Sequence, residues 1–546
     1  MALIPSDTFV QHSIDICRFS WIRRLAVDYV YNYNSLAPFF AGDPSAPEAW
    51  QKTITRRLTL RPPSAFVDVL ATQQQSRGAP SEALAATESL RRPDTLAVVT
   101  GQQAGLFGGP LFTLLKAVTA IKLARRLSQE QSVPVVAVFW VDAEDHDWNE
   151  VASCAVLDAG WQVKRVALEP PLGAGEMPVG SLKLSDNIRA SVEAMASALP
   201  PNEFTATIIN DLRRTYQSGT SMSKAFSLWL ETVLGAEGLI LFDSSDPAAK
   251  PFVKNLFEQE LRHTQTAALA AEAGTQLVAR GYHAQVTPHP ESVALFRVDG
   301  VRQSIRRNNN SFTVGNAQVT LDDLLKALDR HPEQFSPNVL LRPLVQDTLF
   351  PTVCYVPGPN ELAYLAQLKN IYERFEVPMP LIYPRDSATL LDSAAARFLK
   401  RNKLSLEVLQ PQDEAILNQL LKAQLPEAVK QSVDEAQRAL QARIETIIRA
   451  VPTVDPTLAG AARSTLGRME HDLTALHKKI LKAAKRNDST LRRQFMCTQA
   501  QAFPEGRPQE RVLGFVGFLN RFGPKLVDRL LTELPLDPKH HALITP

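Results

Sequence analysis

The segment Asp94–Glu150 decides the fold: DTLAVVTGQQAGLFGGPLFTLLKAVTAIKLARRL, a short spacer, and then VPVVAVFWVDAEDHDWNE. Its two apolar, β-branched runs, Leu96–Thr100 and Val133–Val141, are typical of strands buried on both faces, as in a parallel sheet. Between them, Pro110 suits the first position of a helix, and apolar residues then recur at helical spacing. The segment therefore predicts a strand–helix–strand unit, in which ligands bind beyond the carboxyl ends of the strands.

Three further short apolar runs extend the predicted sheet. They are Gly238–Asp243, Thr352–Val356 and Pro380–Tyr383, and each is followed by a turn and a helical segment. Strands that alternate with helices in this way indicate an α/β fold built on a doubly wound parallel sheet.

The stretches between and after these runs have a different pattern. In 392–505, apolar residues recur every three or four positions on both sides of Pro452–Pro456, which predicts an antiparallel coiled-coil hairpin of helices. The expected organisation is N-terminal helices with the first half of the core in 1–150, a first connecting insertion in 151–235, a core strand and helix in 236–280, a second connecting insertion in 281–335, the second half of the core in 336–391, the hairpin in 392–505, and a C-terminal segment that packs back on the core in 506–546.

Composition indicates an ordinary globular protein. Of the 546 residues, 45% are hydrophobic and 21% are charged, and the formal net charge of +2 gives no reason to expect nucleic acid or an anionic membrane as a partner. No apolar run approaches the length of a membrane span, and the N-terminus lacks the pattern of a secretory signal. The four cysteines are scattered without a CxxC pair, so we expect a cytoplasmic protein with no zinc signature.

The loop after the second strand, Asp142–Asp147, is the first candidate site. Four carboxylates and an imidazole lie within six residues, and like charges this close raise some pKa values. We expect His146, among Glu144, Asp145 and Asp147, to act as an acid or base in catalysis. Mg²⁺ held by the carboxylates is one alternative, and a solvated acidic turn is the other.

The turn after the first strand is the second candidate site. Gly101, Gln102, Gln103 and Gly105 belong to a segment that matches neither GxxxxGK[ST] nor GxGxxG. Glycines and free backbone N–H groups at a helix start nevertheless suit an anion or a polar substrate. A tight turn without a ligand is the alternative.

Basic residues outside these loops are expected at the surface. Lys116, almost two turns into the first core helix, is expected to be exposed. Four arginines of the second insertion, Arg297, Arg302, Arg306 and Arg307, could approach an anionic substrate, but a solvated face is the favoured interpretation.

Several blocks of the sequence resemble one known family. They are TGQQAGLFGGPLFTLLKA from Thr100, FWVDAEDHDWNEV from Phe139, SPNVLLRPLVQDTLFPTVCYVPGPNELAY from Ser336, and the closing QERV and FLNRFG. Together they cover essentially the whole chain and are similar to the bacillithiol-biosynthesis cysteine-adding enzymes. The resemblance implies a ligase that joins cysteine to glucosaminyl-malate through an amide between the cysteine carboxyl and the sugar amine. It also implies a Rossmann core akin to class I synthetases and a homodimer formed through the coiled coil.

The resemblance further implies that ATP activates the cysteine carboxyl, with ATP or ADP and Mg²⁺ as cofactors. The chain departs from the synthetase pattern, because no HIGH-type histidine pair follows the first strand and Gln102-Gln103 stands in its place. A nucleotide near the coiled coil is also expected, with Arg385, Ser387 at a helix start, and Asn520 as candidate contacts.

We hypothesise roles for the candidate residues in such a reaction. His146, oriented by Asp145 or Asp147, is expected to take the proton from the attacking amine. The expected substrate contacts are Gly101, Gln102, Gln103, Gly105, Asn360 and Glu361, with Arg342 and Arg385 against carboxylates or phosphate.

Two other classes of function stay open from the sequence. A metal-dependent hydrolase or nucleotidyltransferase would use the acidic loop and would lose Mg²⁺ or Mn²⁺ binding in Asp145→Asn. A non-catalytic dimeric scaffold would tolerate substitutions at Gln103 and His146 and would lose its function only when the hairpin is cut.

Overall fold

The computed structural model describes residues 12–59, 63–309, 311–423, 427–487 and 489–546. The N-terminal segment in which no secretory signal is expected includes residues 1–11, which lie outside this range. The chain forms two compact units. One contains the residues up to Leu390 together with Pro508–Ile544, and the other contains Leu391–Arg507. Among the described helices, none is long and apolar enough to cross a membrane.

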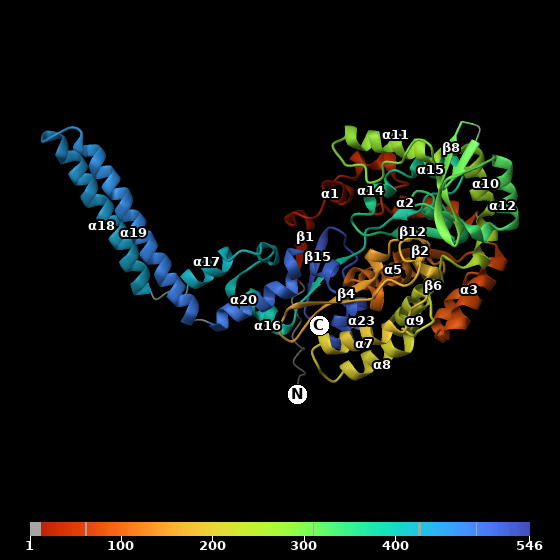
Figure 1. The fold of residues 1–546 in the computed structure, drawn as a ribbon, viewed down its shortest axis with the longest axis horizontal. Coiled ribbons are helices and arrows are strands. Elements are labelled where there is room, and N and C mark those ends of the chain that lie inside the picture. The colour runs from red at the N-terminus through yellow and green to blue at the C-terminus, as the bar shows by residue number, and fades with distance from the viewer. Residues whose placement is uncertain (1–11, 60–62, 310, 424–426, 488) are drawn as a thin grey trace. The chain divides into compact units, whose positions relative to one another are not determined.

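The first unit is organised around a parallel sheet with the strand order β13-β12-β2-β3-β6 (Figure 1). The strands are β2 (Leu96–Gln103), β3 (Val135–Asp142), β6 (Ile240–Asp243), β12 (Thr352–Val356) and β13 (Leu381–Ile382). Every predicted core strand is present, and the prediction of an α/β fold with a doubly wound parallel sheet is confirmed. Because Gln103 pairs with Asp142 in register, β2 and β3 end at the same edge of the sheet.

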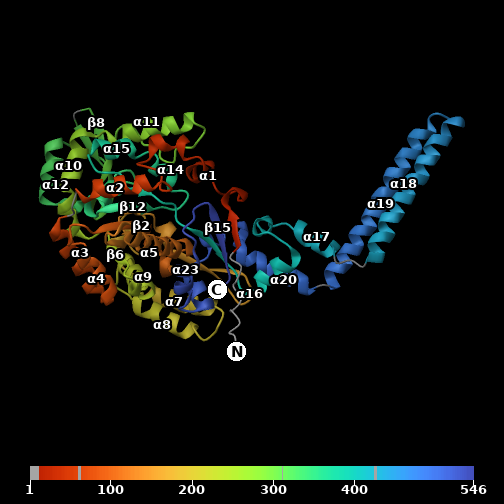
Figure 2. The same cartoon turned by 180° about the vertical axis from the view of Figure 1, so that it is seen from behind.

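Both faces of this sheet are covered, as expected for parallel strands. Alternate residues of β2 point into different cores: Leu96 and Val98 into one, Ala97 and Val99 into the other. The helices of the first unit are α1 (Arg24–Tyr31), α2 (Pro47–Leu58), α3 (Ser64–Arg77), α4 (Ser81–Ser89), α5 (Leu111–Gln131), α6 (Trp148–Val151), α7 (Asn187–Ala198), α8 (Thr205–Thr215), α9 (Met222–Leu234), α10 (Lys254–His263), α11 (Thr266–Ala279), α12 (Leu321–Arg330), α13 (Arg342–Leu349), α14 (Leu362–Leu365), α15 (Lys369–Arg374), α21 (Gln509–Val512), α22 (Phe515–Phe522) and α23 (Leu526–Glu533). Figure 2 shows the same elements from behind.

An antiparallel sheet with the order β10-β9-β8-β7-β11 lies within the same unit. Its strands are β7 (Ser292–Asp299), β8 (Val301–Asn308), β9 (Ser311–Val314), β10 (Ala317–Val319) and β11 (Phe335–Pro337). Through β7 and β8 this sheet supplies Phe296 and Arg302 to the candidate site described below.

Two small sheets complete the unit. One pairs β4 (Ser153–Leu157) with β5 (Val163–Ala167), and the other has the order β1 (His12–Asp15), β15 (His540–Ile544), β14 (Ser387–Leu390). Ser387 therefore begins a strand, and the prediction that it begins a helix is wrong. The reason is that the backbone of β14 pairs in parallel with β15, more than a hundred residues later in the chain.

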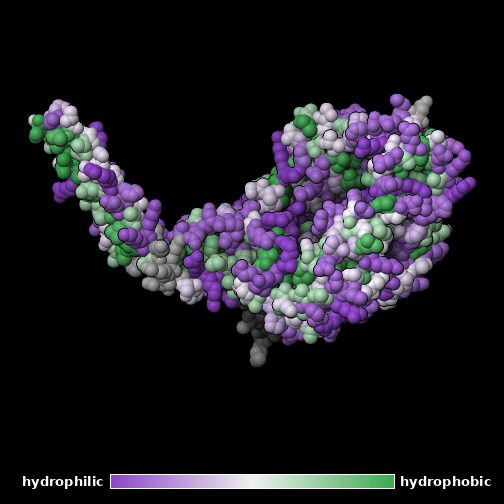
Figure 3. Space-filling view, viewed as in Figure 1, coloured by the Kyte–Doolittle hydropathy of each residue, from purple (hydrophilic) through white to green (hydrophobic). Residues whose placement is uncertain are grey.

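The second unit consists of helices. They are α16 (Ser393–Asn402), α17 (Ala415–Ala423), α18 (Glu427–Ala450), α19 (Leu458–Asn487) and α20 (Ser489–Ala502). Helices α18 and α19 run antiparallel against each other, as the heptad pattern predicts. Apolar side chains remain exposed on the hairpin, including Ile447 at 46%, Met469 at 43% and Leu476 at 51%. Figure 3 shows hydrophobic residues gathered at its free end.

Candidate active site

A cavity of about 630 Å³ lies where the core strands β2, β3 and β12 end. Ligands of open parallel sheets bind at this edge. The residues that line it are Gly101, Gln102, Gln103, Phe112, Lys116, Trp140, Asp142, Glu144, Asp145, Glu150, Gln285, Phe296, Arg302, Pro337, Asn338, Val339, Arg342, Tyr355, Gly358, Asn360, Glu361, Tyr364, Arg385 and Arg511. The cavity wall contains many positively and negatively charged side chains. The ion pairs among them determine which charges remain available to a substrate.

The glycine turn, Gly101–Gly109, lines this cavity with its first three residues, which form the front of the turn. Gly101, Gln102 and Gln103 form its edge, and a Cβ on Gly101 would lie 2.7 Å from the carbonyl oxygen of Trp140. Glycine is therefore needed at position 101 for the close approach of β2 to β3. Gln103 Nε2 donates a 2.8 Å hydrogen bond to Asp145 Oδ2, which joins the two predicted loops directly.

The rear of the glycine turn packs against the C-terminal segment. The Gly105 amide donates to Gln103 at 2.9 Å, and the Leu111 amide, at the start of α5, donates to Leu513 at 2.8 Å. A Cβ on Gly108 would lie 2.2 Å from the ring of Phe515. Gly105 is buried outside the cavity lining, so the structure does not place its amide where a substrate could reach it.

Pro110 also differs from its predicted position. It precedes α5 as the N-cap, because it forms an isolated bridge with Gly514. The start of α5 is thus partly covered by protein: the Leu111 amide donates to Leu513 O and the Thr113 amide to Pro110 O, so neither is free for an anion.

Lys116 is buried in the cavity wall with 2% of its surface exposed, and the prediction of an exposed lysine is wrong. Its Nζ donates to Gly101 O at 2.8 Å and to Gln102 Oε1 at 3.0 Å, and it forms an ion pair with Glu361. Burial lowers the pKa of Lys116, and Glu361 opposes that shift. The signal was present in the sequence, because a helix that is apolar on every side is a buried helix.

Glu361 is the partner of Lys116. Burial works against its ionisation, but Lys116 and the Gly358 amide outweigh burial and hold the pKa of Glu361 below its usual range. Tyr355 donates to the same carboxylate at 3.0 Å. Asn360 lies beside it in the wall and is exposed.

The acidic loop divides between the cavity and the surrounding structure. Asp142 lines the cavity, with its Oδ2 3.8 Å from Arg342 Nε, and burial raises its pKa against the effect of Arg342. Glu144 is buried and forms an ion pair with Lys250. Asp145 accepts hydrogen bonds from both Gln103 and Arg302, the latter at 3.2 Å.

The other two predicted catalytic residues lie outside the cavity lining. The His146 side chain is 46% exposed, with Nδ1 3.2 Å from Asp145 Oδ1 and 3.2 Å from an Arg302 nitrogen. Asp147 caps α6, because its carboxylate accepts a 3.2 Å hydrogen bond from the Glu150 amide. A catalytic role for His146 remains a prediction.

Arg302 is buried, so the prediction of a solvated face is wrong at this position. Its side chain is 8% exposed, its guanidinium lies 3.9 Å from the ring centroid of Phe296, and it donates to Pro337 O at 3.1 Å. Burial lowers the pKa of Arg302, and Asp145 opposes that shift. No periodicity in the sequence could find this contact, because 157 residues separate Arg302 from Asp145.

Arg342 is less directly neutralised than Lys116, Arg302 and Arg385, which each form a closer contact with a carboxylate. It donates to Gln346 Oε1 at 3.2 Å and to the Tyr364 hydroxyl at 3.4 Å, and its Nε lies 3.8 Å from Asp142 Oδ2. Burial opposes its charge, but Tyr355, Tyr364 and Asp142 outweigh burial and raise the pKa of Arg342. The guanidinium therefore stays charged next to the empty space of the cavity.

The three predicted nucleotide contacts do not come together. Arg385 lines the cavity but is bound through both terminal nitrogens to Glu510, at 2.9 and 2.6 Å. The Ser387 hydroxyl shares a 2.9 Å hydrogen bond with His541 Nδ1. Asn520 lies on α22 beside a separate cavity of about 60 Å³ and donates to Pro200 O at 2.9 Å.

The described residues do not fit the two expected cofactors at the expected places. Within the described ranges, no three His, Cys, Asp or Glu side chains are grouped to hold a metal ion. The loop carboxylates have other partners, since Glu144 binds Lys250 and Asp145 binds Arg302. At the start of α5 the Leu111 and Thr113 amides are likewise already paired, with Leu513 O and Pro110 O. No step is therefore assigned to Mg²⁺ or to ATP.

The parallel sheet and the charged cavity at its carboxyl edge define a Rossmann-like α/β enzyme. Comparison with known proteins gives the family. The chain belongs to the bacillithiol biosynthesis BshC family, because residues 13–386 match the model of its N-terminal Rossmann-like domain and residues 388–545 match that of its C-terminal coiled-coil domain. The resemblance seen in the sequence motifs is thereby confirmed.

Relatives named "Putative cysteine ligase BshC" resemble this chain over most of its length. The Salinibacter ruber protein is 33% identical, over 95% of this chain and 96% of its own. The Koribacter versatilis protein is 33% identical, over 85% and 87%, and the Chlorobaculum tepidum protein is 30% identical, over 86% of each. These relatives support a ligase. A solved chain described as a putative arginyl t-RNA synthetase from Campylobacter jejuni has 11% identity and a TM-score of 0.22, covering 84% of this chain and 96% of its own, which is too weak for any argument.

Proposed function

We propose that this protein joins L-cysteine to glucosaminyl-malate by forming an amide between the cysteine carboxyl and the sugar amine. Family membership and the names of the relatives support a ligase of this kind. The observation that carries the proposal is the pairing in one cavity of a charged guanidinium, Arg342, with a carboxylate of raised pKa, Asp142. The Arg342 guanidinium suits a substrate carboxylate, and the Asp142 carboxylate suits a substrate amine.

Polar atoms without partners support a polar substrate. Trp140 Nε1, Gln103 Oε1 and Arg385 Nε are buried and have no hydrogen-bond partner among the described residues, and all three residues line the cavity. Buried donors and acceptors without partners are unfavourable, because they have lost their water and gained nothing in exchange. In this proposal the wall rearranges when substrate binds, and sugar hydroxyls and malate carboxylates become partners of these atoms.

In this proposal Arg342 binds a malate carboxylate, and Asp142 accepts the proton that the sugar amine must lose before it attacks. The raised pKa of Asp142 suits a base that must hold a proton during the reaction. Asp142 is better placed than His146 because it lines the cavity. In this proposal Asp145 and Glu144 hold the acidic loop in place and do not contact the substrate. Asp145 does so through its ion pair with Arg302, and Glu144 through its ion pair with Lys250.

A free cysteine carboxylate does not acylate an amine at neutral pH, so the proposed reaction requires cysteine in an activated form. ATP-type activation, with Mg²⁺, follows from the resemblance alone. The experiment is mass spectrometry on the purified protein with cysteine, glucosaminyl-malate, Mg²⁺ and ATP, repeated without ATP.

Amide product together with nucleotide consumption would support an ATP-dependent ligase. Binding of glucosaminyl-malate without product would mean that cysteine arrives already activated. A protein that neither binds nor converts glucosaminyl-malate would contradict the proposal and favour the hydrolase or the scaffold.

We also propose that the α18–α19 hairpin forms a homodimer. The exposed Ile447, Met469 and Leu476 lie on α18 and α19 and offer apolar surface for a second copy. Light scattering should give twice the chain mass, and Leu476→Glu with Met469→Glu should give the mass of one chain. A monomeric wild-type protein at micromolar concentration would contradict this assembly.

A further inference from the structure

A second cleft in the first unit shares no residue with the cavity. It lies between α2 and α15, has a volume of about 260 Å³, and is called here the α2–α15 cleft. Figures 1 and 2 both show these two helices in the same part of the first unit. Its lining residues are Ala41, Lys52, Thr53, Arg56, Lys369, Tyr372, Glu373, Val377 and Met379.

Three cations converge on this cleft. Lys52 and Arg56 lie one turn apart on α2, and Lys369 begins α15. Among the described residues, none of the three side chains has an ion pair or hydrogen bond, whereas surface arginines elsewhere pair closely, as Arg91 does with Asp68 at 2.8 Å. Like charges four residues apart on a helix repel each other, so a bound anion would stabilise this arrangement.

The floor of the cleft connects to the cavity through buried side chains. The Tyr372 hydroxyl donates to Asp347 Oδ2 at 2.5 Å, and Gln346 Nε2 donates to Asp347 Oδ1 at 2.9 Å. Gln346 Oε1 in turn accepts from Arg342 at 3.2 Å. Tyr372, Asp347 and Gln346 are each at most 2% exposed, so α13 carries a continuous hydrogen-bonded path from the cleft to the cavity.

Arg57 fixes the middle of this path. It donates to the backbone oxygen of Asp347 at 2.8 Å and to that of Pro378 at 2.6 Å. Pro378 lies between Val377 and Met379, which line the cleft. The same buried guanidinium therefore holds both the backbone next to the cleft lining, at Pro378, and the middle of the hydrogen-bonded path, at Asp347.

We propose that the α2–α15 cleft binds a dianionic phosphate group, either free phosphate or a phosphate monoester, and that Tyr372 links its occupancy to Arg342. Three cations and the single carboxylate of Glu373 leave an excess positive charge that a dianion matches. Lysine and arginine bind phosphate oxygens through charge-assisted hydrogen bonds. The small volume suits a small anion better than a whole nucleotide. This binding goes beyond the proposed ligase reaction, which requires only the cavity.

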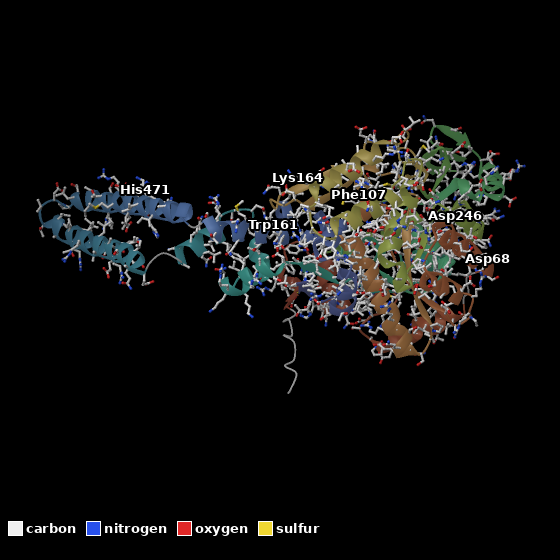
Figure 4. The ribbon with its side chains drawn as sticks, turned by 90° about the horizontal axis from the view of Figure 1, so that it is seen from below. Asp68, Phe107, Trp161, Lys164, Asp246 and His471 are labelled. Carbon is white, nitrogen blue, oxygen red and sulfur yellow. The ribbon has the colours of Figure 1, made fainter. Side chains whose placement is uncertain are left out.

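Calorimetric titration of the full-length protein tests the site. The probes are inorganic phosphate and glycerol 3-phosphate, each added in chloride buffer. We expect saturable binding that weakens about tenfold in Arg56→Gln and in Lys369→Gln, because each removes one charge-assisted contact. Lys164→Gln is the matched control, since Lys164 is a 55% exposed lysine of β5 in the first unit (Figure 4).

Each outcome of the titration decides something. Binding of both probes supports a site for free phosphate, and binding of glycerol 3-phosphate alone supports a site for a phosphate monoester. No saturable binding of either probe would overturn the proposal. Equal affinity in Arg56→Gln and the wild type would place the phosphate elsewhere and would overturn it as well.

Hydrogen exchange of the α13 peptide, Arg342–Leu349, tests the link without any substrate, so its failure is distinguishable from failure of the ligase proposal. Phosphate should slow exchange in the wild type but not in Tyr372→Phe, which keeps the cations of the cleft. Gln346→Met breaks the same path at another point if Tyr372→Phe does not fold. Equal slowing in the wild type and in the folded variant, or no slowing in the wild type, would overturn the link.

Discussion

The glycine turn after β2 and the acidic loop after β3 are adjacent in the sheet, but the structure uses them differently. In each of them the first residues face the cavity, as Gly101 and Asp142 do, and later residues contact protein. The rear of the glycine turn is closed by Leu513 and Phe515 of the C-terminal segment. The rear of the acidic loop remains partly exposed around His146. The order of the strands brings both loops to the cavity, and the packing of protein against each loop determines which of its residues line the cavity.

The largest effect on stability is expected at Lys116, whose buried Nζ donates to Gly101 O and forms an ion pair with Glu361. Lys116→Met leaves the partly exposed Glu361 carboxylate without its cation and removes the buried hydrogen bonds to Gly101 and Gln102, so we expect the free energy of unfolding at pH 7 to fall by about 3 kcal/mol. Urea denaturation measures this change.

The pH dependence of that loss has a definite sign. In the wild type the pKa of Glu361 is lowered, so its contribution is present above the unfolded pKa and is lost as the pH falls through the folded one. Without Lys116 the carboxyl protonates more easily, so the cost of Lys116→Met should be smaller at pH 4 than at pH 7. A cost that grows on acidification would contradict the ion pair.

The largest effect on activity is expected at Asp142. Asp142→Asn removes the proposed proton acceptor and should lower kcat/KM by about 10²–10³-fold, with the fold intact. Because Asp142 must be ionised and its pKa is raised, wild-type activity should fall as the pH drops through a value above 3.8. The variant should lose this limb of the pH profile. Asp147→Asn, which keeps a helix-capping side chain, is the matched control and should retain activity.

The rear of the glycine turn is tested by Gly108→Ala. The new Cβ would meet Phe515 at 2.2 Å and would sit at a φ of +92°, so we expect a loss of about 2 kcal/mol in the free energy of unfolding. Gly219→Ala separates the two causes, because Gly219 has a φ of +80° with nothing within 4 Å, and should cost about 1 kcal/mol. Equal losses in the two variants would show that backbone strain, and not the contact with Phe515, requires glycine at 108.

The smallest effect is expected at His146. If Asp142 is the base, His146→Gln should change kcat/KM by no more than about threefold, since the imidazole lies outside the cavity lining. Steady-state kinetics on the same preparation as Asp142→Asn measures the difference. A loss at His146 as large as that at Asp142 would restore the histidine as the proton acceptor.

The parallel sheet, the edge at which the site lies and the helical hairpin could all be predicted from the amino-acid sequence. These follow from local periodicity, because alternation and helical spacing report which faces of an element are buried. It also identified Gln103, Arg342 and Glu361, which line the cavity from the loops and helices where they were expected.

Which side chains line the cavity, and how they are paired, could not be predicted before the folded structure was known. Lys116 turned inward because every side of α5 around it is buried, and Arg302 arrived from an antiparallel sheet far along the chain. The closure of α5 by Leu513 likewise depends on a segment some four hundred residues later. Such contacts join residues that share no local pattern, and burial, which fixes their pKa values and their partners, exists only after the chain has folded.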